Sequence, residues 1–389
     1  MKHILWLASW YPDEISPYNG DFIQRHARAV ALHLPLTVVY VAQHGPEVEM
    51  PETKVVTHTE GNLTEIIVYF RHRKGEGLLQ RLRYNWKYFY HFRRYMRQYL
   101  AQRGRPDLVH VHIPMKAGRM ALWIRQKFGI PFIVTEHSSA YFPEVPDSYH
   151  RRNAYYRRSV ADIFRAAAAV TTVSQQLGNR LKEVFGIRNM HIITNVADTR
   201  FFHYREVKPP LFRFLHASTM NHPKNVEGIL RALKELKALR ADWECVMLGW
   251  DTPALRAMSS ALGLDGHVIW KGVVSYRQVA AEMQQASVLL VFSRYESQGC
   301  VILEALCCGL PVIATRVGGI PEIVQEHNTI LVESENEQQL LEAMVRSMDQ
   351  YAQFDRPAIA RESQERFSYE TVGKQFADLY NHLYDERNG

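Results

Sequence analysis

The stretch from Ala286 to Val324 constrains the fold of this chain more than any other segment. It opens with a short apolar run, residues 286–292, whose Val and Leu content is typical of a buried parallel strand. Gly299 permits a tight turn, and residues 300–308 are good helix formers. A second apolar run, residues 311–315, predicts the next strand. The order strand, turn, helix, strand predicts a parallel α/β sheet.

The polar residues of this segment fall where the first strand ends. Glu296 lies in the turn, Glu304 follows eight residues later inside the helix, and Gly318-Gly319 follow the second strand. The first N–H groups of a helix favour an anion such as a diphosphate, and a carboxylate near a helix start can accept two ribose hydroxyls. Taken singly, Glu304 could simply open an amphipathic helix. Together, these residues favour a nucleotide site.

This segment carries a family resemblance. The spacing Glu296-x7-Glu304, followed by EALCCGLPVIATRVGGIPEIV, resembles the E-x7-E signature of the retaining glycosyltransferases of family 4. The resemblance implies the GT-B fold, which has two Rossmann-like domains facing across a cleft and a C-terminal helix that crosses back to the first domain. Where the family commonly has E-G-F-G, this chain has Glu296-Ser297-Gln298-Gly299, so the sugar-facing residues differ.

The resemblance also assigns roles around the donor. Glu304 would hold the ribose, and Glu296 would lie beside the transferred sugar. The backbone at Val273 would meet the base. Backbone amides would bind the donor sugar and diphosphate at three positions: Gly299, Cys300 and Val301.

Three further site residues are expected from the resemblance. Lys224 matches the lysine that binds the diphosphate, whereas the usual arginine is replaced by Ser218 or Thr219. His137 follows a predicted strand and matches a histidine near the donor sugar, although a lone histidine is often structural. Gly20 lies in a loop expected to face the cleft, but it could equally be an ordinary turn glycine.

Length and composition indicate two folded domains. A chain of 389 residues with 47% hydrophobic and 22% charged residues exceeds a single ordinary core. We predict an N-terminal domain over residues 1–205, joined by helix 371–389, and a nucleotide-sugar-binding domain over residues 206–370. A proline-containing linker is expected near residues 207–210. The four cysteines lack metal spacing and are expected to be reduced.

The positive charge is concentrated in the first half. Residues 1–205 contain 29 Lys/Arg and 16 Asp/Glu, and residues 71–105 alone contain eleven Lys/Arg, one acid and many aromatic residues. Such a helix can lie on an anionic membrane or meet a lipid-linked acceptor. It could instead pack its rings on the sheet while its arginines are merely solvated. Nucleic acid is the partner we expect least.

These features predict a glycosyltransferase that moves a sugar, with retention, from a UDP- or GDP-sugar to a glycan or lipid-linked acceptor. We expect a role in cell-surface polysaccharide or lipopolysaccharide synthesis, no cofactor and no essential metal. The N-terminus lacks a secretory leader and no apolar run is long enough to span a bilayer, so we expect a cytoplasmic enzyme, peripheral on the inner membrane face. A nucleotide-sugar epimerase and a non-catalytic membrane or RNA adaptor remain as alternatives.

Overall fold

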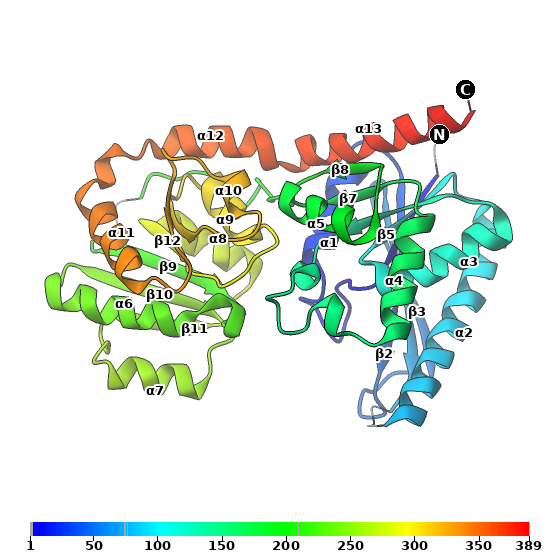
Figure 1. Ribbon diagram of the computed structural model, residues 1–389, viewed down its shortest axis with the longest axis horizontal. Coiled ribbons are helices and arrows are strands. Elements are labelled where there is room, and N and C mark those ends of the chain that lie inside the picture. The colour runs from blue at the N-terminus through cyan, green and yellow to red at the C-terminus, as the bar shows by residue number, and fades with distance from the viewer. Residues whose placement is uncertain (1–2, 74, 76, 208–209, 389) are drawn as a thin grey trace. The chain divides into compact units, whose positions relative to one another are not determined.

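The computed structural model describes residues 3–73, 75, 77–207 and 210–388. The chain divides into two compact units, shown in Figure 1. The first comprises residues 1–173, 178–193 and 372–389, and the second comprises residues 174–177 and 194–371. Of the predicted linker, Lys208 and Pro209 lie outside the described residues, as do Lys74 and Glu76 of the basic stretch.

The first unit contains an eight-stranded sheet in the order β3-β4-β2-β1-β5-β6-β7-β8. All pairs are parallel except β3 with β4, which is antiparallel. The strands are β1 Ile4–Ala8, β2 Leu36–His44, β3 Thr53–Glu60, β4 Leu63–Arg71, β5 Leu108–His112, β6 Phe132–Glu136, β7 Val170–Thr172 and β8 Met190–Ile192. The helices are α1 Asp21–Ala31, α2 Leu78–Arg103, α3 Arg119–Phe128, α4 Ala154–Ala166, α5 Gln175–Phe185 and α13 Tyr369–Asn388.

The C-terminal helix α13 belongs to the first unit from Val372 onward. This agrees with the prediction that a C-terminal helix crosses back to the first domain. The hydroxyl of Tyr380 accepts the Trp6 indole N–H at 3.1 Å and shares a 2.7 Å hydrogen bond with His110 Nδ1. Gly373 lies so close to α1 that a Cβ there would be 2.1 Å from the Ala29 carbonyl oxygen. These contacts tie the last helix to β1, β5 and α1.

The second unit contains a six-stranded sheet in the order β11-β10-β9-β12-β13-β14, with all pairs parallel. The strands are β9 Phe212–Ser218, β10 Trp243–Gly249, β11 Val268–Gly272, β12 Val288–Val291, β13 Val312–Thr315 and β14 Thr329–Val332. The helices are α6 Val226–Leu239, α7 Pro253–Ala261, α8 Tyr276–Gln285, α9 Cys300–Cys307, α10 Ile320–Ile323, α11 Glu337–Asp349 and α12 Arg356–Phe367.

Two hydrophobic cores cover the two faces of this second sheet. One packs α6 and α11 against it, and the other packs α8, α9 and α12 against the opposite face (Figure 1). The order of the strands reverses between β9 and β12, so the loops that follow these two strands meet at one point of the sheet edge. Ligands of open parallel sheets bind at such a point.

The boundary between the units lies earlier than predicted. Residues 194–205 were assigned to the first domain, but they pack with the second. Phe202 is buried in the same core as Ile302, and the Asn195 N–H donates to Gln298 Oε1 at 2.8 Å. The apolar burial of Phe202 therefore fixes this segment on the second unit.

Candidate functional site

The strand, glycine turn and helix predicted around Glu296 are present. The chain leaves β12 at Val291, turns through residues 293–299, and enters α9 at Cys300. Gly299 is the N-cap, with φ 89°, and its position offers no side chain to cap the first N–H groups. Cys300 and Val301 are the first two residues of the helix. Their backbone N–H groups can therefore bind an anion at the helix N-terminus.

The second glycine turn lies directly against the first. A Cβ placed on Gly318 would be 1.7 Å from the carbonyl oxygen of Glu296, so only glycine permits this approach. The Gly319 N–H also donates to the Ser297 carbonyl at 3.2 Å. The expected pairing of the two turns is confirmed. It fixes the backbone on which Glu296 is carried.

Glu304 lies inside α9 and is only 6% exposed. The phenol hydroxyl of Tyr276 donates to its Oε1 at 2.9 Å. Tyr276 is the first residue of α8, whose start is fixed by a capping box between Ser275 and Gln278, and its ring packs against Phe202. This hydroxyl orients the carboxylate that we expect to bind ribose, and no motif or spacing in the sequence singles out Tyr276.

Val273 follows the end of β11 and is 47% exposed. Its backbone lies at the carboxyl edge of the second sheet, two residues before the capping box of α8. The exposed position leaves this segment accessible to a base, and that role stays a prediction.

Lys224 and Glu296 are brought into direct contact. Lys224 ends a short 3₁₀ turn, His222–Lys224, and its Nζ forms an ion pair with Glu296 Oε1. Ser293 Oγ donates to the same oxygen at 3.1 Å. Both side chains are mostly buried, at 24% and 11% exposed, which strengthens the pair relative to a surface salt bridge. The cation and the carboxylate assigned to the donor therefore share one small site.

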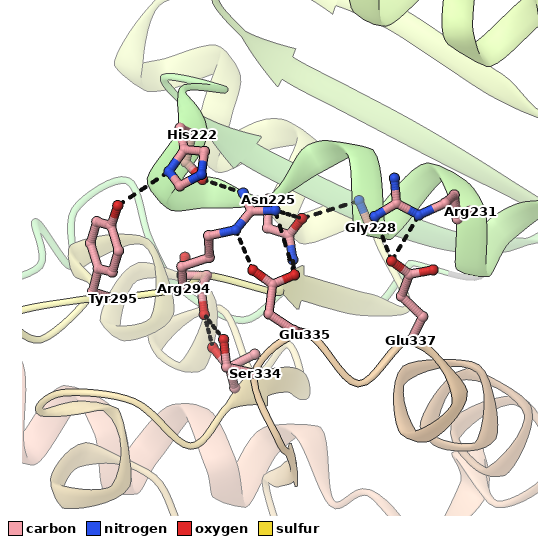
Figure 2. A network of polar contacts seen from close by, with 11 residues as sticks. His222, Asn225, Gly228, Arg231, Arg294, Tyr295, Ser334, Glu335 and Glu337 are labelled. Atoms are coloured by element: carbon pink, nitrogen blue, oxygen red, sulfur yellow. Dashed lines mark hydrogen bonds and ion pairs between the residues drawn. The ribbon is translucent and has the colours of Figure 1, made fainter. Parts of the chain in front are cut away.

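Arg294 holds the loop that carries Lys224 (Figure 2). Its backbone N–H donates to the Pro223 carbonyl at 2.8 Å. Its guanidinium donates to the His222 carbonyl at 2.5 Å and to Asn225 Oδ1 at 2.7 Å, and its Nε is paired with Glu335. Asn225, at φ 49°, also caps α6 by accepting the Gly228 N–H at 3.2 Å. The loop from His222 to Asn225 is thus held by Arg294 and by the start of α6.

Ser218, one of the two residues expected at the position of the missing arginine, has a hydroxyl that is already hydrogen-bonded. His216 is buried, and desolvation lowers its pKa to about 4, so the ring is neutral. Its Nδ1 donates to the Leu290 carbonyl at 2.9 Å, so Nε2 must accept from Ser218 Oγ at 2.7 Å. Ser218 Oγ accepts in turn from the Met220 N–H at 2.9 Å. The Ser218 hydroxyl is therefore not available to donate to a phosphate.

Gly20 and His137 belong to the first unit and lie on one edge of its sheet. Gly20 is the N-cap of α1; a Cβ on it would be 2.7 Å from the Trp10 backbone. His137 follows β6, and its ring lies 4.8 Å from that of Phe22 on α1. Each of the predicted site residues therefore lies at the carboxyl edge of its own sheet or at the helix that follows.

The turn at His137 is built on Glu136. One carboxylate oxygen accepts the N–H groups of His137 and Ser138, each at 2.8 Å, and the other accepts the Tyr141 hydroxyl at 2.6 Å. Burial raises the pKa of Glu136 to about 6, against the lowering effect of these hydrogen bonds. This carboxylate fixes the backbone that presents His137.

Three buried histidines of the first unit could hold a metal ion. Ligand atoms of His26, His112 and His137 all lie within 4.8 Å of one another. His112 Nδ1 and His137 Nε2 share a 3.1 Å hydrogen bond, and burial, followed by the neighbouring histidines, holds the pKa of His112 well below its usual value. Neutral imidazoles suit a transition metal. The same hydrogen bond can equally fix the tautomers without a metal.

Comparison with known proteins agrees with this fold. The family Glycosyltransferase Family 4 matches residues 24–201, and Glycosyl transferases group 1 matches residues 200–369. A teichuronic acid biosynthesis glycosyltransferase of Bacillus subtilis, TuaC, described as putative in its name, is 26% identical over 96% of this chain and 94% of its own. The N-acetyl-alpha-D-glucosaminyl L-malate synthase of Bacillus anthracis is 26% identical over 75% of this chain and 78% of its own.

Solved structures show the same architecture. A sucrose-phosphate synthase from Thermosynechococcus elongatus superimposes with a TM-score of 0.80 at 20% identity, covering 99% of this chain and 100% of its own. Anabaena Alr3699/HepE, solved with UDP, has a TM-score of 0.72 at 17% identity, covering 98% of this chain and 100% of its own. With its two family matches together spanning residues 24–369, this chain is a GT-B glycosyltransferase that belongs to family 4.

Proposed function

We propose that this enzyme transfers a sugar from a UDP- or GDP-sugar, with retention of the anomeric configuration, to a hydroxyl of a glycan or lipid-linked acceptor. The observation that carries the proposal is the constellation at the β9–β12 edge. There, the start of α9, the Lys224–Glu296 pair on the loops after β9 and β12, and the buried Glu304 carboxylate inside α9 lie close together in the fold. The name of one relative, which includes teichuronic acid biosynthesis, supports cell-surface polysaccharide synthesis as the setting. Lipopolysaccharide synthesis is the other setting that we propose.

The chemistry follows from the charges at this edge. Departure of the nucleoside diphosphate places negative charge on the leaving oxygen, which Lys224 and the amides at the start of α9 would stabilise. Positive charge develops on the sugar, beside Glu296. Glu304 would hold the ribose, and His137 keeps the role near the donor sugar that the family resemblance implies. We assign no covalent step to Glu296.

We further propose that the enzyme acts on the inner face of the cytoplasmic membrane, that residues 71–105 meet an anionic surface, and that no metal is needed. No helix in the described part of the chain is both long enough and apolar enough to cross a bilayer.

The first test is nucleotide binding without added metal. A ligand at one hundred times its Kd adds about 2.7 kcal/mol to the free energy of unfolding, which a thermal shift detects. We expect one of UDP or GDP, and its sugar conjugate, to shift the wild type. Glu304→Gln should lose the shift, whereas Glu326→Gln, an exposed residue of the same unit, should keep it. An unchanged shift in Glu304→Gln would refute the ribose role.

The second test separates transfer from the alternatives. A transferase should give a product whose anomeric configuration, read by NMR, matches that of the donor. An epimerase should incorporate deuterium from heavy water into the sugar without an acceptor. An adaptor should show neither reaction, and its membrane or RNA binding should survive Glu304→Gln.

A further inference from the structure

A groove of about 1170 Å³ runs along the solvent side of α2 in the first unit. No aspartate or glutamate of the described residues lines it. Its cationic lining consists of five arginines: Arg81, Arg93, Arg94, Arg97 and Arg119. A concave surface of this size with one sign of charge attracts anions strongly.

One end of the groove is apolar and exposed. Leu78, Leu82 and Trp86 are 73%, 55% and 66% exposed, and Leu79 beside them is 72% exposed. These side chains occupy the first three turns of α2. The Trp86 ring is stacked on Tyr90, with 5.4 Å between centroids and 12° between planes, so one of its two faces is covered. Grouped exposed apolar side chains of this kind mark a surface that meets an apolar partner.

At the basic end of the groove, arginine side chains lie against aromatic rings. The guanidinium groups of Arg93 and Arg97 each lie 5.9 Å from the Trp123 ring, and Arg119 lies between Phe89 and Tyr155. Burial, and then the neighbouring Arg93, lowers the pKa of Arg119 from its ordinary value. Arg119 Nη1 also donates to the Tyr155 hydroxyl, which fixes this guanidinium, and its other N–H groups and those of Arg93 and Arg97 can donate to a phosphate.

The apolar end lies on the side of the sheet where Gly20 and His137 lie. Helix α2 follows β4, and Tyr84 near its start packs on Phe70 at the end of that strand. Its far end returns to the start of β1, where Tyr99 bonds to His3 at 2.7 Å. From Leu78 to Arg97 the groove extends roughly 28 Å along the helix.

We propose that this groove binds the phosphate head group of a bilayer phospholipid. The phosphate would lie between Arg93, Arg97 and Arg119, and the chains would pass over Leu82 and Leu78 into the membrane. The proposal deepens the proposed function, on which it rests, because it places a membrane beside the predicted acceptor edge of the first unit. A nucleic acid fits less well, since the exposed leucines offer no hydrogen bonds to its bases.

The test is co-sedimentation of the full chain with phosphatidylglycerol-containing vesicles. The groove variant changes Arg93, Arg94 and Arg97 to Gln, and the charge-matched control changes Arg73, Arg83 and Arg103, which are exposed and outside the groove, to Gln. Each removes the same charge, so diffuse attraction predicts equal losses. We expect the groove variant to bind roughly tenfold or more weakly than the control variant.

A second variant tests the apolar end. Replacing Leu78 and Leu82 by Ser changes no charge and alters exposed side chains, so folding should be retained. It should weaken vesicle binding severalfold and raise its sensitivity to salt. Equal binding by the two arginine variants, no effect of the serine changes, or tighter binding of a single-stranded RNA than of vesicles would each overturn the proposal.

The nucleotide thermal shift, measured on the same proteins, separates the two proposals. Both arginine variants should keep the shift. If the shift is present but vesicles do not bind the wild type, the lipid groove is wrong and the donor site stands. If vesicles bind but no nucleotide raises the unfolding temperature, the groove is a lipid-binding surface and the proposed sugar transfer is wrong.

Discussion

Lys224 Nζ is paired with Glu296 Oε1, and Ser293 Oγ donates to that same oxygen at 3.1 Å. The lysine expected to meet the diphosphate thus neutralises the carboxylate expected to lie beside the sugar. An arriving diphosphate would compete with Glu296 for this cation. Lys224 can therefore exchange its ion pair with Glu296 for one with the diphosphate when the donor binds.

The Lys224→Ala variant should transfer sugar slowly while still binding the nucleotide. Loss of a preorganised donor to a developing anion costs about 100- to 1000-fold in kcat. The measurement is steady-state kinetics with the identified donor, beside the nucleotide thermal shift. Lys234→Ala, an exposed lysine of α6 in the same unit, is the control and should behave as wild type. Normal kcat in Lys224→Ala would remove the lysine from the reaction.

Arg294 should act through Lys224 as a positioning residue. Its guanidinium joins the His222 carbonyl, Asn225 and Glu335, so Arg294→Ala would release the loop that carries the lysine. We expect kcat to fall about tenfold or more, with a smaller change in KM, because the loop's geometry matters most in the transition state. Arg294→Lys restores charge but not the fork of hydrogen bonds and should rescue poorly.

A double-mutant cycle distinguishes this positioning role from general destabilisation. If Arg294 acts through Lys224, adding Arg294→Ala to Lys224→Ala should cost little further activity. Additive losses in kcat would show that Arg294 has an independent role. Arg231, whose guanidinium pairs with Glu337 in the same region (Figure 2), provides the control. Arg231→Ala should lower the free energy of unfolding, but its effect on kcat should not depend on whether Lys224 is present.

Local patterns were enough to predict the strand, turn, helix and strand around the candidate site. The apolar runs 286–292 and 311–315 contain β12 and β13, and the helix expected over residues 300–308 is α9, Cys300–Cys307. The ends of these elements are set by nearby glycine, proline and apolar periodicity. The edge strand β3 escaped prediction. Its residues are mostly exposed and polar, and it exists because all eight pair with β4.

The network around the candidate site could not be predicted in the same way. Arg294 lies 72 positions from His222, and Tyr276 lies 28 from Glu304, so their contacts depend on the parallel arrangement of β9 and β12 and on the start of α8. To predict that the Ser218 hydroxyl is already hydrogen-bonded, one must know that His216 is neutral and that its Nδ1 is the donor. Sequence spacing identifies the residues, and only the fold shows which hydrogen bonds are already used.

Tyr276→Phe should weaken nucleotide-sugar binding without abolishing it. The change removes one hydrogen bond to Glu304, worth roughly 1 kcal/mol, and so predicts about a fivefold higher Kd. Calorimetry with the nucleotide that gave the thermal shift measures this. The ring packing on Phe202 is retained, so stability should change little. A Kd equal to that of the wild type would mean that Glu304 is oriented without Tyr276.

Chelation should leave sugar transfer unchanged, as the metal-free proposal requires. Because His26, His112 and His137 could hold an ion, the enzyme dialysed against a chelator should be assayed beside its measured metal content. If activity falls with metal loss and zinc restores it, the proposal of metal-free transfer is wrong. Full activity at a metal content near zero would support it and leave the histidines as a hydrogen-bonded cluster.

Acid should destabilise the second unit through His216. Burial lowers its pKa to about 4 in the folded state, while the unfolded value stays near 6.5, so the unfolded chain binds more protons between these values. The stabilising contribution is therefore present above pH 6.5 and is lost as pH falls. At pH 5 the loss is about 2 kcal/mol.

The measurement is denaturant unfolding of the wild type and of His216→Gln at pH 7 and pH 5, with the signal of the second unit resolved. Glutamine cannot be protonated in this range, so the variant should be less stable at pH 7 but should lose about 2 kcal/mol less than the wild type on acidification. His267→Gln, at a histidine of the same unit whose Nδ1 donates to the Trp243 carbonyl, serves as the control. An identical acid loss in wild type and His216→Gln would show that His216 is not the group responsible.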